Sequence, residues 1–353
     1  MPKKLIIFCD GTWNKPPKYS TNVLRMLQAT DPEDAGKNPQ LVHYIAGIGT
    51  RKGERFSGGT FGYGISDNIK DAYSFIVSNY ERGDEIFLFG FSRGAFTARS
   101  IAGLIRNFGV LKRQHLPLVG VAYDNYRSGS AEWHPDPEKG GIKTAEFRRN
   151  YCHGEDTTIK FLGVWDTVGA LGAPFGAVLG YIVDKLFKCS FHDTKLSTYV
   201  LNAYHALAID EHRWPFRPTL WRLQAVHEER NKESTKTHGY LRYEEKWFPG
   251  VHGDVGGGHE HTGLSDCALL WMANCAARHG LNVNLKRITD RHGRSFAPDP
   301  AQEIGKSQSP LYRLATLAFV KLPSLAKINT VYPKRDYALV TNISLNGDYI
   351  RPH

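Results

Sequence analysis

"EIFLFGFSRGA", residues 85–95, is the stretch that decides the fold of this chain. An apolar run typical of a buried strand ends in a serine between two glycines, and helix-compatible residues follow. A GxSxG motif in this setting predicts a nucleophile elbow, a tight strand-to-helix turn that exposes the serine at the carboxyl end of a sheet. Gly90 and Gly94 would keep side chains away from the neighbouring backbone. We therefore predict Ser92 as a nucleophile; the alternative is a tight connection with an ordinary serine.

Strand and helix patterns alternate along most of the chain. Besides 85–91, short apolar runs predict strands at 5–9, 41–46, 159–165 and 247–251. Helical spacing predicts helices at 22–29, 65–80, 95–107, 199–210 and 264–279. Such alternation predicts a mostly parallel central sheet with helices on both faces. We expect one domain over residues 1–353, with inserted segments at about 111–157 and 170–198 and a less regular region at about 290–353.

A serine nucleophile needs a histidine base and an acid that orients the histidine. After a nucleophile elbow, the acid and then the histidine follow the serine along the chain. The run FLGVWD ends in Asp166, and the run WFPGVH ends in His252. Because the carboxyl ends of parallel strands meet at one edge of a sheet, we expect both to lie near Ser92. His259 and His261 share a loop with His252 and compete with it as the base.

An oxyanion hole needs two backbone donors. One is expected at the amide of Arg93, directly after the serine. Gly11 and Thr12 follow the first strand and are the candidates for the second donor. The alternative for this segment is a simple turn. Asp10 also ends a strand, but it precedes Ser92 in the chain, so we expect it to accept hydrogen bonds from loop amides.

The composition indicates a folded, basic protein. The net charge is +10 and the isoelectric point is about 9.2, which favours anionic partners. The chain carries no motif from the standard nucleic-acid-binding set, so nucleic acid is not an expected partner. We expect a lipid or another ester as the substrate, and a peripheral contact with an anionic membrane surface. The oligomeric state is left open by the sequence.

Neither membrane spans nor a disulfide framework are expected. No apolar stretch is long enough to cross a bilayer, and the first apolar run is too short for the core of a signal peptide. We expect a soluble protein that is cytoplasmic or exported without a conventional signal peptide. The five cysteines show no CxxC spacing and are expected to be reduced and buried.

Three further segments could line the site. Residues 47–64 form a glycine-rich stretch that lacks the spacing of a P-loop and is expected to be structural or to line a pocket. Its cationic side chains, which could meet an anionic headgroup, are Arg51, Lys52 and Arg55. Residues 174–187 could form a lid or a buried insertion helix. Residues 311–328 form a basic amphipathic piece that packs on the core or lies on a membrane.

A group of possible metal ligands surrounds the predicted base. A metal-dependent phosphoesterase that activates water is therefore an alternative function. Against it, the group has no HExxH pattern and comes from one loop, whereas hydrolytic metal sites collect ligands from several elements. Its members are His252, Asp254, His259, Glu260, His261 and Asp266.

Five blocks of the sequence resemble one known family. They are IFCDGTWN, GIGT, YERGDEIFLFGFSRGAFTARSIAGLI, FLGVWDTVGALG and WFPGVHGDVGGGH. In this order they are similar to the α/β-hydrolase domain of bacterial type VI secretion phospholipase effectors and their bacterial and fungal relatives. The resemblance covers roughly residues 4–280. It implies Ser92 as nucleophile, Asp166 as acid and His252 as base. The family often has a serine at the position of Gly253 and an aromatic residue at that of His259.

The expected activity follows from the order of serine, acid and histidine together with the family resemblance. We predict a serine esterase of the lipase or phospholipase type, which forms an acyl-enzyme and needs no metal or organic cofactor. Besides the metal-dependent phosphoesterase, one other alternative stays open. The same fold could serve as a catalytically idle module that binds a lipid or a protein partner.

Overall fold

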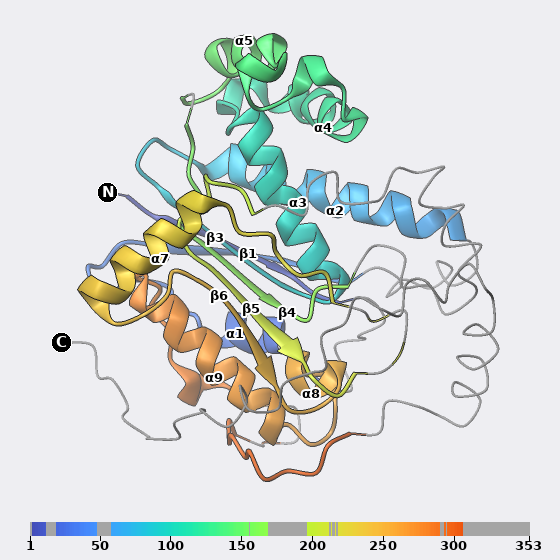
Figure 1. Cartoon of the computed structure of the whole chain (residues 1–353), viewed down its shortest axis with the longest axis vertical. Helices are drawn as coiled ribbons and strands as arrows, with labels where there is room; N and C mark the ends of the chain where they lie inside the picture. Colours follow the sequence, from blue (N-terminus) through green and yellow to red (C-terminus); the bar gives the residue numbers. More distant parts are fainter. Residues whose placement is uncertain are drawn as a thin grey trace.

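A parallel six-stranded sheet lies at the centre of the computed structural model, with strand order β2-β1-β3-β4-β5-β6 (Figure 1). The structure describes residues 2–11, 19–47, 58–154, 156–168, 196–211, 218–289 and 295–305, with residues 213, 216 and 293. The strands are β1 (Lys4–Cys9), β2 (Gln40–Ile45), β3 (Glu85–Phe91), β4 (Phe161–Trp165), β5 (Ala203–Ala208) and β6 (Tyr243–Phe248). Because all of them run in the same direction, their carboxyl ends share one edge.

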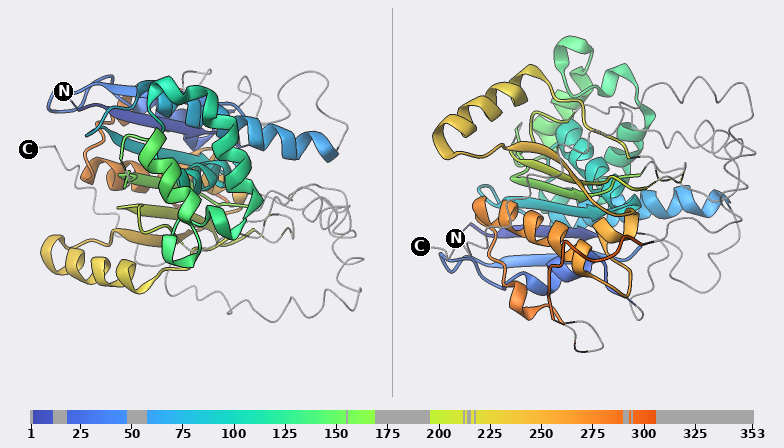
Figure 2. Two further views of the ribbon diagram at one scale, coloured as in Figure 1. Left: turned by 90° about the horizontal axis from the view of Figure 1, so that it is seen from above. Right: turned by 60° about the horizontal axis from the view of Figure 1, so that its bottom comes forward.

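Helices cover both faces of the sheet, as predicted. α2 and α3 pack on one face, and α1 and α9 lie on the other (Figures 1 and 2). Together with the sheet they form the α/β-hydrolase-like architecture expected from the elbow. The helix bounds are α1 (Asn22–Ala29), α2 (Gly58–Asn79), α3 (Arg93–Phe108), α4 (Val119–Ser128), α5 (Ile142–Tyr151), α7 (Ala225–His238), α8 (His252–Gly256) and α9 (Gly263–Arg278).

The two faces are filled by alternate residues of the buried strands. In β1, Leu5 and Ile7 join the core under α2 and α3, whereas Ile6 and Phe8 join the core under α1 and α9. Successive side chains of a strand point to opposite faces, and both faces here are covered. This is why the strands read as continuous apolar runs. Each fully buried large apolar side chain contributes about 1.5–3 kcal/mol to folding.

Residues 111–157 were expected as an insertion, and the described part forms helical structure beside α3. α4 and α5 both contact α3 and extend beyond the sheet (Figure 1). Three short 3-10 helices, η1 (Arg113–Leu118), η2 (Ala131–Trp133) and η3 (Pro137–Lys139), lie in the same segment. The expected insertion at 170–198 lies outside the described residues up to residue 195.

The helix predicted at 199–210 is wrong, because the structure has strand β5 there. All six residues of β5 are buried, and the sheet covers each side of the strand. The alanines of AYHALA fit a strand between two other strands and two helical layers, although alanine favours a helix in isolation. The strand predicted at 247–251 is displaced toward the amino terminus, since β6 ends at Phe248 and α8 begins at His252.

Several predicted features lie outside the described residues. They are Thr12, Cys189, residues 48–57 with the three cationic side chains, residues 174–187 and residues 311–328. Cys9, Cys152, Cys267 and Cys275 are free thiols; Cys267 is only partly buried, whereas the other three are buried as expected. Among the described helices, none combines the length and the apolar character needed to cross a membrane.

Candidate active site

Ser92 stands at the turn from β3 to α3, at the shared carboxyl edge. Its backbone has φ 57° and ψ −121°, a left-handed conformation that side chains disfavour. A Cβ atom added at Gly90 would lie 2.5 Å from the carbonyl oxygen of Gly94. One added at Gly94 would lie 2.1 Å from the carbonyl oxygen of Cys9 in β1. The two glycines are therefore required by close backbone approach within the elbow and between the elbow and β1.

Backbone strain marks the acid as well as the serine. Among the described residues other than glycine, only Lys37, Ser92 and Asp166 have positive φ. Asp166 follows β4 with φ 37°. Strained residues persist where the surrounding structure holds them in place, and they concentrate at active sites. Two of the three, Ser92 and Asp166, directly follow the adjacent strands β3 and β4 and are the predicted nucleophile and acid.

The carboxylate of Asp166 is fully buried and is held from two sides. Its Oδ1 accepts a hydrogen bond from the amide of Ala208 at 3.1 Å. Its Oδ2 lies 2.6 Å from Nδ1 of His252. Because Nδ1 donates to this carboxylate, Nε2 is left to accept a proton. The structure thus brings together the predicted acid and the predicted base, which are far apart in the sequence.

The imidazole of His252 lies between two aromatic rings. The Phe91 ring, from the residue just before Ser92, is 4.6 Å away between centroids, and the Phe216 ring is 4.9 Å away. The amide of His252, at the start of α8, donates to Glu211 Oε2 at 3.3 Å. Phe91 therefore positions the base beside the strand end that carries the serine.

Glu211 and Phe216 were not found by sequence reasoning. Neither belongs to a motif, and both reach His252 only through the fold. Glu211 is also paired with Arg213, whose Nη2 lies 2.7 Å from Oε2. Burial raises the pKa of Glu211, but the bonds from Arg213 outweigh it, so the pKa is lowered overall and the carboxylate stays charged. The Arg213 guanidinium lies over the Phe216 ring at 3.9 Å.

His205 supports the loop that carries the acid. It lies fully buried in β5, and its Nε2 accepts a hydrogen bond from the amide of Thr167 at 3.1 Å. Its Nδ1 lies 2.9 Å from Glu245 Oε1. Burial lowers the pKa of His205, which favours the neutral ring that can accept this bond. Its contacts connect it to the residue after Asp166.

Of the donors expected for an oxyanion hole, Arg93 and Gly11 belong to the described residues. Arg93 is the first residue of α3, so its amide has no carbonyl of its own helix to bond. Burial lowers the pKa of its guanidinium to about 10. The amide of Gly11 donates to Asp10 Oδ1 at 2.6 Å, so it faces that carboxylate.

Asp10 accepts hydrogen bonds at the end of β1, as expected. Besides Gly11, the donors are the hydroxyls of Thr21 at 2.8 Å and Tyr44 at 2.7 Å. Burial raises the pKa of Asp10, although the three hydrogen bonds act in the opposite direction. Its carboxylate ties β1 to the start of α1 and to β2, next to the place where Gly94 approaches.

The competing histidines have other neighbours. His259 Nδ1 lies 3.0 Å from Asp254 Oδ1, and the side chain is 45% exposed. A Cβ atom at Gly253 would lie 2.4 Å from Nε2 of the same His259 ring. The two positions that depart from the family pattern therefore contact each other. His261 is exposed.

The possible metal ligands of this loop are not gathered into one site. His252 binds Asp166, Asp254 binds His259, and Asp266 forms a buried ion pair with Arg25. In the described parts of the chain, no three His, Cys, Asp or Glu side chains are arranged to hold a metal ion. The geometry of this loop therefore gives the metal-dependent alternative no support.

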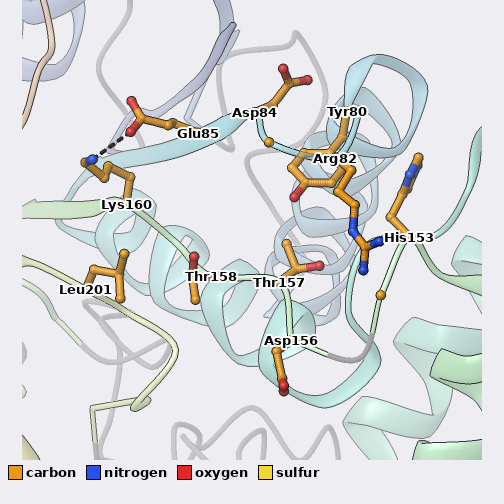
Figure 3. A pocket seen from close by; sticks show the side chains of 12 residues that line it. Tyr80, Arg82, Asp84, Glu85, His153, Asp156, Thr157, Thr158, Lys160 and Leu201 are labelled. Carbon is orange, nitrogen blue, oxygen red and sulfur yellow. Dashed lines mark hydrogen bonds and ion pairs between the residues drawn. The ribbon is translucent and has the colours of Figure 1, made fainter. Parts of the chain in front are cut away.

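A cavity of about 570 Å³ opens at the opposite edge of the sheet (Figure 3). Glu85 and Lys160, which are ion-paired at 2.6 Å, lie on one side of it, and Arg82 and His153 lie on the other. These residues lie at or before the amino ends of β3 and β4, whereas Ser92 follows a carboxyl end. This cavity is therefore separate from the candidate active site.

Comparison with known proteins points to one family. Residues 3–275 match the family model described as the type VI secretion system phospholipase effector Tle1-like catalytic domain. The uncharacterized protein YEL023C of Saccharomyces cerevisiae is 28% identical over 236 residues, which are 61% of this chain and 32% of that protein. The chain thus spans about a third of this curated relative.

Solved structures with distant similarity were also found. An uncharacterized protein from Pseudomonas aeruginosa has a TM-score of 0.43 and 17% identity, with 93% of this chain and 52% of that chain covered. The Tle1 effector bound to the VgrG spike of the type 6 secretion system has a TM-score of 0.39 and 19% identity, with 73% and 51% covered.

Proposed function

Because the chain belongs to the family of type VI secretion phospholipase effector Tle1-like catalytic domains, we propose that it is a serine esterase that hydrolyses a carboxylic ester of a lipid. The observation that carries this proposal is the 2.6 Å contact between His252 Nδ1 and Asp166 Oδ2, together with the strained Ser92, whose amide donates to the carbonyl of Trp165 just before Asp166. A phospholipid is the substrate class that the family favours, and the net charge of +10 suits an anionic lipid surface.

The mechanism is a two-step acyl transfer. His252 Nε2 takes the proton of the Ser92 hydroxyl as Oγ attacks the ester carbonyl carbon. The tetrahedral intermediate collapses, the alcohol leaves with that proton, and an acyl-enzyme remains. Water then attacks the acyl carbon with the same base, which releases the carboxylic acid and regenerates Ser92. Asp166 holds the tautomer of His252 and stabilises the imidazolium that forms.

The oxyanion is held by backbone donors. The Arg93 amide is one, and the second comes from the segment after β1, where Gly11 and Thr12 stand. A donor of this kind is typically worth about 3–4 kcal/mol in the transition state. The use of the Gly11 amide requires that it turn from Asp10 toward the substrate.

Covalent labelling tests this proposal. A fluorophosphonate probe should add once per chain, and the labelled peptide should contain Ser92. Ser92→Ala and His252→Ala should remove the labelling. Ser100→Ala, which changes a buried serine of α3, should leave the labelling unchanged. Turnover of a phospholipid by Ser92→Ala, with loss of activity on addition of a chelator, would favour the metal-dependent alternative and refute the proposal.

A further inference from the structure

A cavity of about 260 Å³ lies between α3, the segment with η2, and the starts of β4 and β5. Arg99 and Arg106 line it from α3, about two helical turns apart and hence on one face of the helix. Trp133, His134 and Trp221 line it as well. Arg99 is about 10 Å along the helix from the Ser92 turn, so the cavity is distinct from the nucleophile.

The lining of this cavity is cationic. It contains two guanidinium groups and an imidazole, and none of the lining residues that the structure describes is acidic. Among the described residues, Glu245 acts on Arg99 electrostatically, and its Oε1 also accepts from His205 and from the amide of Trp221. A cation with little access to water attracts an anion more strongly than one on an open surface does.

Arg99 is held at the cavity wall by the fold. Its Nη1 donates to the carbonyl of Thr219, and its guanidinium lies 5.9 Å from the centre of the Trp221 ring. Burial lowers the pKa of Arg99 to about 10, so the group is still protonated at neutral pH. The Arg99 guanidinium is therefore held in one orientation before any ligand binds, which reduces the entropy lost on binding.

Trp221 brings an aromatic ring to the cavity wall, and the residue is 7% exposed. The rings of Trp221 and Trp133 also give the cavity flat apolar walls, against which a small organic group can pack.

We propose that this cavity binds a small organic phosphate, with the phosphate between Arg99 and Arg106 and the organic part against Trp133 and Trp221. A guanidinium matches two phosphate oxygens through paired donors, which favours this anion over a halide. The volume is slightly below the 300–1,000 Å³ range of ordinary ligand pockets, so the ligand is compact. The phosphate comes either from a free metabolite or from a lipid headgroup.

Tryptophan fluorescence of the full chain tests the site, because two of its tryptophans line the cavity. Glycerol 3-phosphate should cause a saturable change, and glycerol should cause none. Arg106→Gln should weaken the apparent affinity at least tenfold. Arg149→Gln, which removes an exposed arginine outside the cavity, should leave it unchanged, and so should Ser92→Ala. If Arg106→Gln does not fold, His134→Gln replaces it with the same expectation.

The arms of the experiment separate the outcomes. Competition by phosphatidylglycerol vesicles, but not by phosphatidylcholine vesicles, assigns the phosphate to a lipid headgroup, and no competition assigns it to a free metabolite. Equal affinity of Arg106→Gln and the unchanged chain would overturn the site, as would the absence of saturable binding. Because Ser92→Ala is expected to bind glycerol 3-phosphate normally, this test would remain valid even if the esterase proposal were refuted.

Discussion

Gly94→Ala tests the physical basis of the elbow directly. The added Cβ atom would stand 2.1 Å from the carbonyl oxygen of Cys9 and 2.6 Å from that of Asp10. Real Cβ atoms do not approach other atoms closer than 3.0 Å, so β1 or the start of α3 must shift by about 1 Å. Both are packed backbone, and neither can relieve the contact by rotating a side chain.

The expected cost follows from that geometry. Overpacking a core position costs about 1–3 kcal/mol, and a clash with backbone belongs at the upper end. The helix propensity gained by replacing glycine with alanine offsets at most about 1 kcal/mol. A net loss of about 2 kcal/mol lowers the melting temperature of a chain of this size by roughly 3 °C. Because the shift also moves the Ser92 turn, we expect fluorophosphonate labelling to slow at least tenfold.

The matched control is Gly120→Ala in α4. A Cβ atom there would meet nothing within 4 Å, and the φ of Gly120 lies outside the left-handed range. We expect its melting temperature to stay within about 2 °C of the unchanged chain, with a normal labelling rate. Thermal melting and labelling kinetics of the two variants are measured side by side. A Gly94→Ala variant that melts and labels like Gly120→Ala would refute the close approach of α3 to β1.

Three further predictions concern the acid, a buried histidine and a buried ion pair. Asp166→Asn should slow phospholipid turnover by roughly 10³–10⁴, because an amide cannot hold the productive tautomer of His252; turnover within tenfold of normal would exclude Asp166 as the acid. Burial lowers the pKa of His279 to about 4. The folded protein then binds fewer protons than the unfolded chain, so stability is complete above about pH 6.5 and falls by at most about 3 kcal/mol as the pH drops toward 4. Urea titrations over this range should show a smaller fall for His279→Gln, and an unchanged fall would contradict this assignment. Asp266→Asn should cost about 3–5 kcal/mol, since Arg25 would keep a buried charge without its carboxylate. Arg25→Met with Asp266→Leu should recover much of that loss in the same urea assay, and no recovery would argue against an uncompensated charge.

Local sequence was enough to predict an element where one continuous stretch carries its recognisable pattern. The strand, the glycines and the serine of the elbow are contiguous, and Gly90 is required by a contact within that turn, whereas Gly94 is required by the close approach of β1. Continuous apolar runs likewise predicted four of the six strands at nearly their true positions. The exceptions are β5, which is rich in alanine, and β6, which has three consecutive charged residues; the strand preference of both depends on what covers them.

The candidate site needed more than local pattern. The order of serine, acid and histidine indicated Asp166 and His252, but three histidines competed for the same role within one loop. Only the fold brings His252 to 2.6 Å from Asp166 while His259 turns to Asp254. The fold also identifies Gly11 as the loop amide that donates to Asp10, where the sequence had left the same amide as a candidate oxyanion donor.

The sequence by itself therefore determined the parallel sheet, the elbow at Ser92 and the family, because each depends on neighbours along the chain or on ordered blocks within it. The family resemblance already indicated His252, but only the tertiary structure showed its contact with Asp166, its contacts with Glu211 and Phe216, and the cavity that Arg99 and Trp221 line. These contacts join residues on different strands and helices. Their distances depend on the twist of the sheet and the packing of its layers, which no local stretch of sequence specifies.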